Sequence, residues 1–333
     1  MNRLAIIGAG SWGTALAIVA ARAGHDVSLW SRNAEVVSSI NKRRINERYL
    51  TEAKIPDGVT ATSEMTTALD EASVVILAAP SHSIRELLSI ASDSIDRHTI
   101  IVSAAKGIEI ESGKRVSEIV GEAVGQESLN RFVCLSGPSF AQEVIKNHPT
   151  AVVAASVNRD AAQIVQHALS FESLRIYTNT DVVGTEFGGA VKNVMAIAAG
   201  MVAGLGFGSN SQAALITRGL AEISRLALFH GAKTETLMGL AGLGDLVLTC
   251  TGHLSRNRFV GEQLGKGKTL AEITSGMNEV AEGIKTTLAV KQLADRAGLE
   301  MPITDQVKAV LYDGKSVQHA VDELMSRPLK GEG

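Results

Sequence analysis

The chain has 333 residues, enough for two domains that each bury a core, and its formal net charge of −3 gives no reason to expect nucleic acid or an anionic membrane surface as a partner. Its two cysteines, Cys134 and Cys250, lie far apart and predict a reducing compartment, and its eight histidines show no metal-ligand spacing. We therefore expect a cytoplasmic protein with no metal, no nucleic-acid partner and no stable insertion into a membrane.

A glycine-rich fingerprint stands at the start of the chain. Residues 4–7 form an apolar run typical of a buried parallel strand, and an Ala/Leu-rich segment with helical spacing follows. Between them, Gly8, Gly10 and Gly13 make the pattern G-x-G-x-x-G, and a second strand is predicted over residues 26–30. In this context the first glycine permits a tight turn, the second lets a pyrophosphate approach the backbone, and the third lets the helix pack on the strand. The pattern predicts a dinucleotide site.

The end of the second predicted strand bears on the choice of dinucleotide. Proteins of this architecture that are specific for NAD carry an acidic residue there, which binds the ribose 2′-hydroxyl. This chain has Ser31-Arg32-Asn33 instead, and an arginine can pair with a 2′-phosphate or stack on adenine. The sequence favours NADPH over NADH, with an ordinary solvated arginine as the alternative interpretation of Arg32.

The first half of the chain alternates short apolar runs with helical segments, and the helix after residue 62 is predicted to be capped by Ser63. The further predicted strands are residues 59–62, 74–78, 99–104, 132–135, 151–155 and 174–177. This alternation predicts βαβ units and a mostly parallel sheet, which is a Rossmann-type α/β domain over residues 1–183.

The second half of the chain shows almost no strand pattern. Helix-length periodic segments separated by glycine predict an all-helical domain over residues 184–326, followed by a tail at 327–333, with the boundary inside one long helix. The most apolar stretch, residues 194–208, is glycine-rich and too short to span a membrane. We expect the ligand crevice outside the carboxyl ends of the strands, against the helical domain.

Two lysines stand where packing alone does not explain them. Lys106 directly follows a buried strand, and Lys192 lies inside a helix of small and apolar residues, with Gly188 one turn earlier. We expect a substrate to approach the helix beside Gly188, although a lysine that extends to the helix edge is the plainer alternative. A desolvated lysine near a second ammonium has a lowered pKa and exchanges protons near neutral pH. This favours Lys192 as the base of an alcohol dehydrogenation and Lys106 as a cation that orients the substrate.

A third cluster follows at residues 245–257. Ser255 is a suitable N-cap, so Arg256, Asn257 and the free backbone amides of the next helix could bind an anion such as phosphate. An ordinary capped, basic helix start is an equally good interpretation of this segment on its own.

Five motifs in this order resemble those of bacterial NAD(P)-dependent glycerol-3-phosphate dehydrogenases: GAGSWGTALA, AAKGIE, LSGPSFAQEV, VKNVMAIAAG, and GLGDLVLTC followed by SRNR. The resemblance extends to about residue 325. It implies a homodimer that reversibly reduces dihydroxyacetone phosphate to sn-glycerol 3-phosphate with NADH or NADPH, and so supplies phospholipid synthesis.

The resemblance also implies roles for single residues. Lys192 would be the proton acceptor. The residues near the cofactor would be Gly8, Gly10, Ser11, Trp12, Gly13, Arg32, Lys106, Ala141, Arg256, Val280 and Glu282. The residues near the substrate would be Lys106, Gly137, Ser139, Lys192, Asp245, Ser255, Arg256 and Asn257.

Two other functions fit parts of the sequence. A β-hydroxyacid dehydrogenase or a ketopantoate reductase would share the first domain and a lysine carried on a helix. Gly188 and Lys192 match the G-x-x-x-K of the hydroxyacid family, but the asparagine expected four residues further on is Ala196. A non-catalytic NADP sensor could keep the same fold, and the presence of both lysines and the anion site argues against it.

Overall fold

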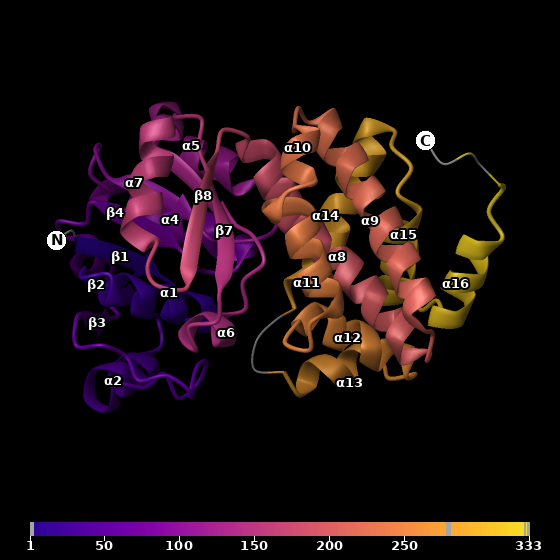
Figure 1. Ribbon diagram of the computed structural model, residues 1–333, viewed down its shortest axis with the longest axis horizontal. Coiled ribbons are helices and arrows are strands. Elements are labelled where there is room, and N and C mark those ends of the chain that lie inside the picture. Colours follow the sequence, from indigo (N-terminus) through magenta and orange to yellow (C-terminus); the bar gives the residue numbers. More distant parts are fainter. Residues whose placement is uncertain (1–2, 278–280, 330, 332–333) are drawn as a thin grey trace.

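The computed structural model describes residues 3–277, 281–329 and 331, and it places an α/β half beside a helical half (Figure 1). The α/β half, drawn from indigo to magenta, carries the described strands of the sheet, and the later part of the chain, drawn in orange and yellow, is helical. The predicted fold class is confirmed.

An eight-stranded sheet forms the centre of the α/β half, in the order β3-β2-β1-β4-β5-β6-β7-β8. Its strands are β1 (Arg3–Ile7), β2 (Asp26–Trp30), β3 (Val59–Thr62), β4 (Val74–Leu77), β5 (Ile100–Ser103), β6 (Phe132–Ser136), β7 (Thr150–Ala155) and β8 (Leu174–Asn179). Alternate side chains of β1 enter different cores, Leu4 and Ile6 on one face and Ala5 and Ile7 on the other. Both faces are therefore buried, which is why the strands are apolar throughout.

Among the described strands, one neighbouring pair is antiparallel. β6 and β7 run in opposite directions, with Ser136 opposite Val153, whereas the other pairs are parallel. The connection between them contains only the five-residue helix α6 (Ala141–Ile145), so the chain turns at the carboxyl edge and comes straight back. A parallel return would need a crossover along the length of the sheet, usually made by a longer helix.

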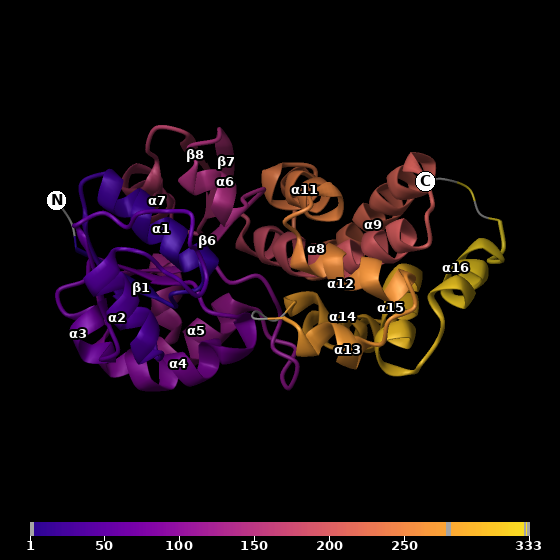
Figure 2. The same ribbon diagram turned by 90° about the horizontal axis from the view of Figure 1, so that it is seen from below.

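Helices cover both faces of the sheet (Figures 1 and 2). They are α1 (Ser11–Arg22), α2 (Ala34–Arg43), α3 (Met65–Leu69), α4 (Ile84–Ala91), α5 (Val116–Val124), α6 and α7 (Arg159–Leu169). The predicted cap by Ser63 is wrong, because α3 begins one residue later, with Glu64 at the N-cap and no side-chain cap bond. Ser63 instead accepts a hydrogen bond from Trp30 Nε1 at its carbonyl oxygen, at 2.9 Å.

The helical half is built around α8 (Val182–Gly204), which packs against α9, α11, α12 and α14 (Figure 2). The other helices are α9 (Ser209–Phe229), α10 (Thr234–Leu237), α11 (Asp245–Thr251), α12 (Arg256–Gly265), α13 (Leu270–Ser275), α14 (Glu282–Ala297), α15 (Pro302–Tyr312) and α16 (Val317–Met325). By length and composition α8 could cross a membrane, so the argument that residues 194–208 are too short does not hold. However, 89% of the apolar segment of this helix is buried inside the protein, which is typical of a core helix.

A buried carboxylate joins the two halves. Glu186, in the second turn of α8, accepts hydrogen bonds from the backbone N–H and the hydroxyl of Ser117, at 2.7 and 2.6 Å, and from Arg115 at 2.8 Å. Burial raises the pKa of Glu186, and Arg115 and Ser117 oppose that rise. The contact fixes the direction in which α8 leaves the sheet.

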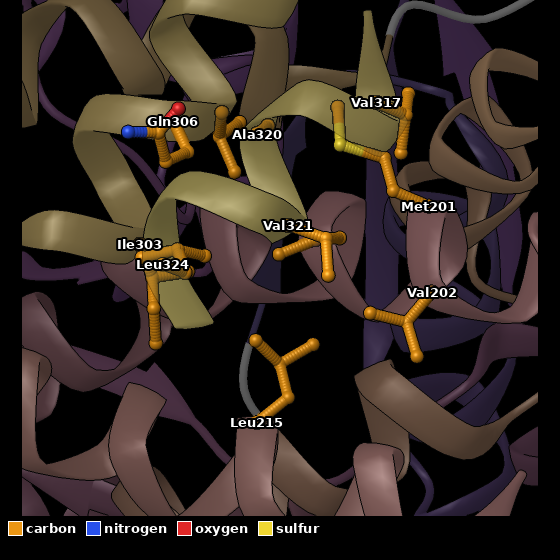
Figure 3. A pocket seen from close by; sticks show the side chains of 11 residues that line it. Met201, Val202, Leu215, Ile303, Gln306, Val317, Ala320, Val321 and Leu324 are labelled. Atoms are coloured by element: carbon orange, nitrogen blue, oxygen red, sulfur yellow. The ribbon is translucent and has the colours of Figure 1, made fainter. Parts of the chain in front are cut away.

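Two hollows in the structure lie apart from the predicted site. Where α16 packs over α8, α9 and α15, apolar side chains including Val202, Leu215, Val321 and Leu324 line a small, partly open hollow of about 30 Å³ (Figure 3). An open hollow of about 540 Å³ surrounds Asp96 at the amino ends of β4 and β5. Ligands of doubly wound sheets bind at the carboxyl ends of the strands, so neither hollow fits the expected crevice.

Candidate active site

The loop between β1 and α1 has the geometry of a dinucleotide cradle. Gly8 has a φ of +120°, and a Cβ on Gly13 would lie 1.9 Å from the carbonyl oxygen of Gly8, so both positions require glycine for the fold itself. A Cβ on Gly10 would meet nothing within 4 Å. Gly10 is the N-cap of α1 and supplies no side-chain hydrogen bond to its first turn, as is common where a helix start binds an anion. These features fit a bound pyrophosphate.

The other residues predicted near the cofactor surround this loop. The Ser11 hydroxyl donates to the carbonyl oxygen of Tyr49 at 2.8 Å, and Trp12 packs partly buried against the core. Arg32 is exposed directly after β2. Asn33, next to Arg32, is the N-cap of α2, and its side chain accepts from two backbone N–H groups. This capping role accounts for an asparagine at that position.

Two further residues predicted near the cofactor lie elsewhere. Ala141 begins α6, and Val280 lies outside the described residues.

The two predicted lysines meet at one buried carboxylate. Lys106 follows β5, Lys192 lies near the middle of α8, and Asp245 is the first residue of α11. The Lys106 Nζ donates to Asp245 Oδ2 at 2.7 Å, and the Lys192 Nζ donates to Asp245 Oδ1. The side chain of Asp245 is 1% exposed and that of Lys192 is 6% exposed. The strand edge and two helices thus bring both ammonium groups into one low-dielectric cluster.

The charges in this cluster shift one another's protonation. Burial and, to a smaller extent, the nearby Lys106 ammonium together lower the pKa of Lys192 to about 8, against the opposing effect of Asp245. Burial alone would raise the pKa of Asp245, but the two ammonium groups together hold it below its ordinary value. Asp245 is therefore an anion at neutral pH, while Lys192 exchanges its proton close to neutrality.

A second strand end completes the edge of the cluster. The carbonyl oxygen of Gly137, just after β6, accepts from the Lys106 Nζ at 3.0 Å and from the Ser139 hydroxyl at 3.1 Å. Gly137 has a φ of +139°, and a Cβ there would lie 2.9 Å from Val152, so the turn requires glycine. This geometry holds the Lys106 ammonium at the carboxyl edge of the sheet.

A chain of amide hydrogen bonds links the cluster to α12 and α14. Asn193 Nδ2 donates to the carbonyl oxygen of Lys106 at 3.3 Å, and Asn257 Nδ2 donates to Asn193 Oδ1 at 3.0 Å. Asn257 Oδ1 in turn accepts from the backbone N–H of Gly283 at 2.9 Å. The side chain of Asn257 is thus engaged on both sides, and it fixes the start of α14 against the start of α12.

The remaining predicted residues lie around these two helix starts. Ser255 is the N-cap of α12, and its hydroxyl accepts from the backbone N–H of Arg258, which confirms the predicted cap. Arg256 is exposed in the first turn. Glu282 accepts from the backbone N–H of Ser81 at 3.1 Å, and burial raises its pKa, which Ser81 and then the charge of Arg256 lower.

One expectation about the site is wrong, and one contact was missed. Gly188 is no entry for a substrate, because a Cβ there would lie 2.4 Å from the carbonyl oxygen of Ala241, and this glycine serves helix packing. Thr249 is a further contact of the site that the sequence did not predict, and its hydroxyl accepts from the Lys192 Nζ at 2.8 Å. Thr249 lies four residues after Asp245, and this spacing could have predicted that the two side chains share one face of a helix.

Comparison with known proteins gives matches over nearly the whole chain. The family models for the N-terminus and the C-terminus of NAD-dependent glycerol-3-phosphate dehydrogenase match residues 3–162 and 181–322. A relative from Koribacter versatilis (strain Ellin345), named as a glycerol-3-phosphate dehydrogenase that uses NAD(P)+, is 54% identical over 98% of each chain. The crystal structure of glycerol-3-phosphate dehydrogenase from Coxiella burnetii is 40% identical, with a TM-score of 0.94 over 98% of this chain and 99% of that one.

A more distant match bears on the alternative function. A ketopantoate reductase from Ralstonia eutropha JMP134 superposes with a TM-score of 0.59 at 15% identity, over 97% of this chain and 99% of that one. A likeness at this identity shows that the two proteins share a fold, and it carries no argument about the substrate.

Proposed function

Because this chain belongs to the family of NAD-dependent glycerol-3-phosphate dehydrogenases, we propose that Lys192 is the general acid and base of its reaction and that Asp245 and Lys106 position it. The reaction is the reduction of dihydroxyacetone phosphate to glycerol 3-phosphate with NADH or NADPH. The observation that carries the proposal is the buried Lys192–Asp245–Lys106 cluster at the carboxyl edge of the sheet.

The reduction needs a hydride at the carbonyl carbon and a proton at the carbonyl oxygen. When bound, the reduced nicotinamide supplies the hydride. The Lys192 ammonium donates the proton to the oxygen, and in the reverse direction the neutral amine takes the hydroxyl proton. A pKa of about 8 populates both forms near neutral pH, as a group that works in both directions needs.

The hydrogen bonds within the cluster aim both lysines at a substrate. An ammonium group has three N–H donors. Within the described part of the chain, Lys192 uses two of them, on Asp245 and Thr249, and Lys106 uses two, on Asp245 and Gly137. Each lysine therefore keeps one N–H donor for a ligand, and Lys106 can orient the substrate while Lys192 transfers the proton.

The start of α12 is our proposed site for the substrate phosphate. Ser255 caps the helix and leaves its first amide N–H groups directed outward, where the helix dipole favours an anion. Arg256 adds a cation, and its charge acts on Glu282 at the start of α14. Asn257 holds the two helix starts together, so the phosphate site and the proton-transfer site are linked by hydrogen bonds through Asn193.

We further propose that the enzyme prefers NADPH, acts in the cytoplasm as a homodimer and supplies phospholipid synthesis. Arg32 at the end of β2 supports the cofactor preference, since no carboxylate stands there to bind a 2′-hydroxyl. Cys134 and Cys250 are both buried free thiols, which suits a reducing compartment. The resemblance of the five motifs to the bacterial family supports the homodimer and the metabolic role.

The pH dependence of the two directions tests the role of Lys192. Reduction needs the ammonium form, so its kcat/KM should be level below about pH 8 and fall about tenfold per pH unit above it. Oxidation needs the amine, so its kcat/KM should rise up to about pH 8 and then become level. Initial rates in both directions, from about pH 6 to about pH 10, measure these limbs. Profiles that bend only at the ordinary lysine value of 10.5, or not at all, would contradict the assignment.

A further inference from the structure

We propose that His82 and Lys285 join Arg32 in a site for the 2′-phosphate of NADPH, so that both halves of the protein set the cofactor preference. The three residues belong to three different elements. Arg32 follows β2, His82 lies in the 3₁₀ turn Ser81–Ser83 after β4, and Lys285 lies in the first turn of α14. This inference rests on the proposed function, because it assigns a specificity to the same cofactor.

A hydrogen bond holds two of these elements together. The backbone N–H of Ser81 donates to Glu282 Oε1 at 3.1 Å, and this bond joins the β4 turn to the start of α14. His82 is one residue from the donor, and Lys285 is three residues from the acceptor. The contact therefore brings a cation of the helical half next to the edge of the sheet.

The charges that act on His82 agree with this arrangement. Burial lowers the pKa of His82, and the charges of Lys285 and then Arg32 lower it further. Glu111 acts in the opposite direction, as the least of the four influences. Charges on separate elements affect one another in this way only when they are close, because water and salt screen distant pairs.

Arg32 and Lys285 are cations whose charges hold His82 toward its neutral form. Within the described residues, Arg32, His82 and Lys285 are exposed and form no ion pair or side-chain hydrogen bond. By contrast Arg85, three residues after His82, binds both Glu109 and Glu122. At His82 the positive charges of Lys285 and Arg32 outweigh the negative charge of Glu111, and a bound dianion would offset them and favour the protonated imidazole.

The position of the group identifies the anion. The strand order β2-β1-β4 places the ends of β2 and β4 on either side of β1 and its glycine loop. With a pyrophosphate at the start of α1, the adenosine ribose lies at the end of β2, where the 2′ position is recognised in this architecture. Arg32 is the residue at that place, and a 2′-phosphate beside it would face His82 and Lys285. NADH lacks this phosphate, so the three side chains discriminate between the two cofactors.

Binding measurements without turnover test the proposal. Dissociation constants of the full chain for NADPH and NADH are measured by nicotinamide fluorescence, and those for adenosine 2′,5′-bisphosphate and AMP by competition. The variants are His82→Gln and Lys285→Gln. The matched controls are His319→Gln and Lys268→Gln, because these exposed residues lie in α16 and in the loop between α12 and α13. Loss of one charge-assisted contact should raise the dissociation constant for NADPH and for the bisphosphate about tenfold.

The same variants should change NADH and AMP binding by less than about twofold, and the controls should change nothing, because the lost contact is to the 2′-phosphate alone. Equal weakening of NADPH and NADH, or no change in either, would overturn the proposal. Its failure is distinct from failure of the proposed function, because the wild-type protein would still reduce dihydroxyacetone phosphate. If the wild-type protein did not reduce dihydroxyacetone phosphate, the proposed function would fail. The dissociation constants for NADPH and NADH would still test the 2′-phosphate site.

Discussion

Lys192→Ala is expected to lower kcat for reduction of dihydroxyacetone phosphate by about a hundredfold or more at saturating substrate, because the variant has no general acid at the carbonyl oxygen. Asp245 keeps its ion pair with Lys106 in this variant, so the carboxylate is not left unpaired. The dissociation constant for NADPH should stay within about threefold of the wild-type value, since the loss concerns the reacting atoms. Steady-state kinetics with both substrates varied separate kcat from KM.

A matched control and a rescue experiment distinguish chemistry from packing. Lys266→Ala removes a half-exposed lysine that pairs with Glu262 on the surface, and it should leave kcat unchanged. Added methylamine should restore part of the activity of Lys192→Ala, because a small amine can occupy the vacated volume and donate the proton. Wild-type turnover in the variant, or a loss of activity that appears only in KM, would show that Lys192 is not the acid.

Asp245→Asn is expected to move the descending limb of the reduction profile to lower pH. The Asp245 carboxylate raises the pKa of Lys192 against burial, so an uncharged amide of the same shape lets that pKa fall below its value of about 8. Less of Lys192 is then protonated at neutral pH, and kcat/KM for reduction at neutral pH should fall about tenfold or more. The profile for oxidation should shift in the same direction. A limb that stays in place would contradict the role of Asp245.

The same variant should also be less stable, and the loss should depend on pH. Removal of one partner of a buried ion pair costs about 3–5 kcal/mol. The lysine pKa in the folded variant lies further below its unfolded value, so the unfolded state binds more protons and the stability deficit is largest at low pH. The deficit should shrink as pH rises toward about 8 and stay constant above that pH, where Lys192 is neutral in both folded proteins. Urea unfolding at two pH values measures this, with Asp295→Asn on the surface as the control.

The local pattern of the sequence predicts most of the fold. The strand at residues 26–30 and the one at 59–62 end where expected, because turn residues delimit their apolar runs. The antiparallel pairing of β6 with β7 and the N-cap of α3 were not predicted. Both depend on the path of the chain in space, about which the periodicity of the sequence carries no information. Residues 194–208 were misjudged because the helix begins earlier, at Val182, and only its burial identifies it as a core helix.

The candidate site was predictable only in part, for the same reason. Lys106 and Lys192 stood out because a strand end and an apolar helix are unusual places for lysine. The meeting of both ammonium groups at Asp245 required the position of α11, which lies 53 residues beyond Lys192 in the sequence. Thr249 and the pairing of Asn193 with Asn257 likewise became visible only when the helices were placed against one another.

The most direct test of this account is oxidation of NADPH and NADH by the purified protein with dihydroxyacetone phosphate, beside ketopantoate as the substrate of the alternative enzyme. The account predicts rapid oxidation with dihydroxyacetone phosphate and none above background with ketopantoate. It also predicts that both activities with dihydroxyacetone phosphate decline together above about pH 8. Faster turnover of ketopantoate than of dihydroxyacetone phosphate would contradict the account. So would binding of NADPH with no oxidation of it when dihydroxyacetone phosphate is added.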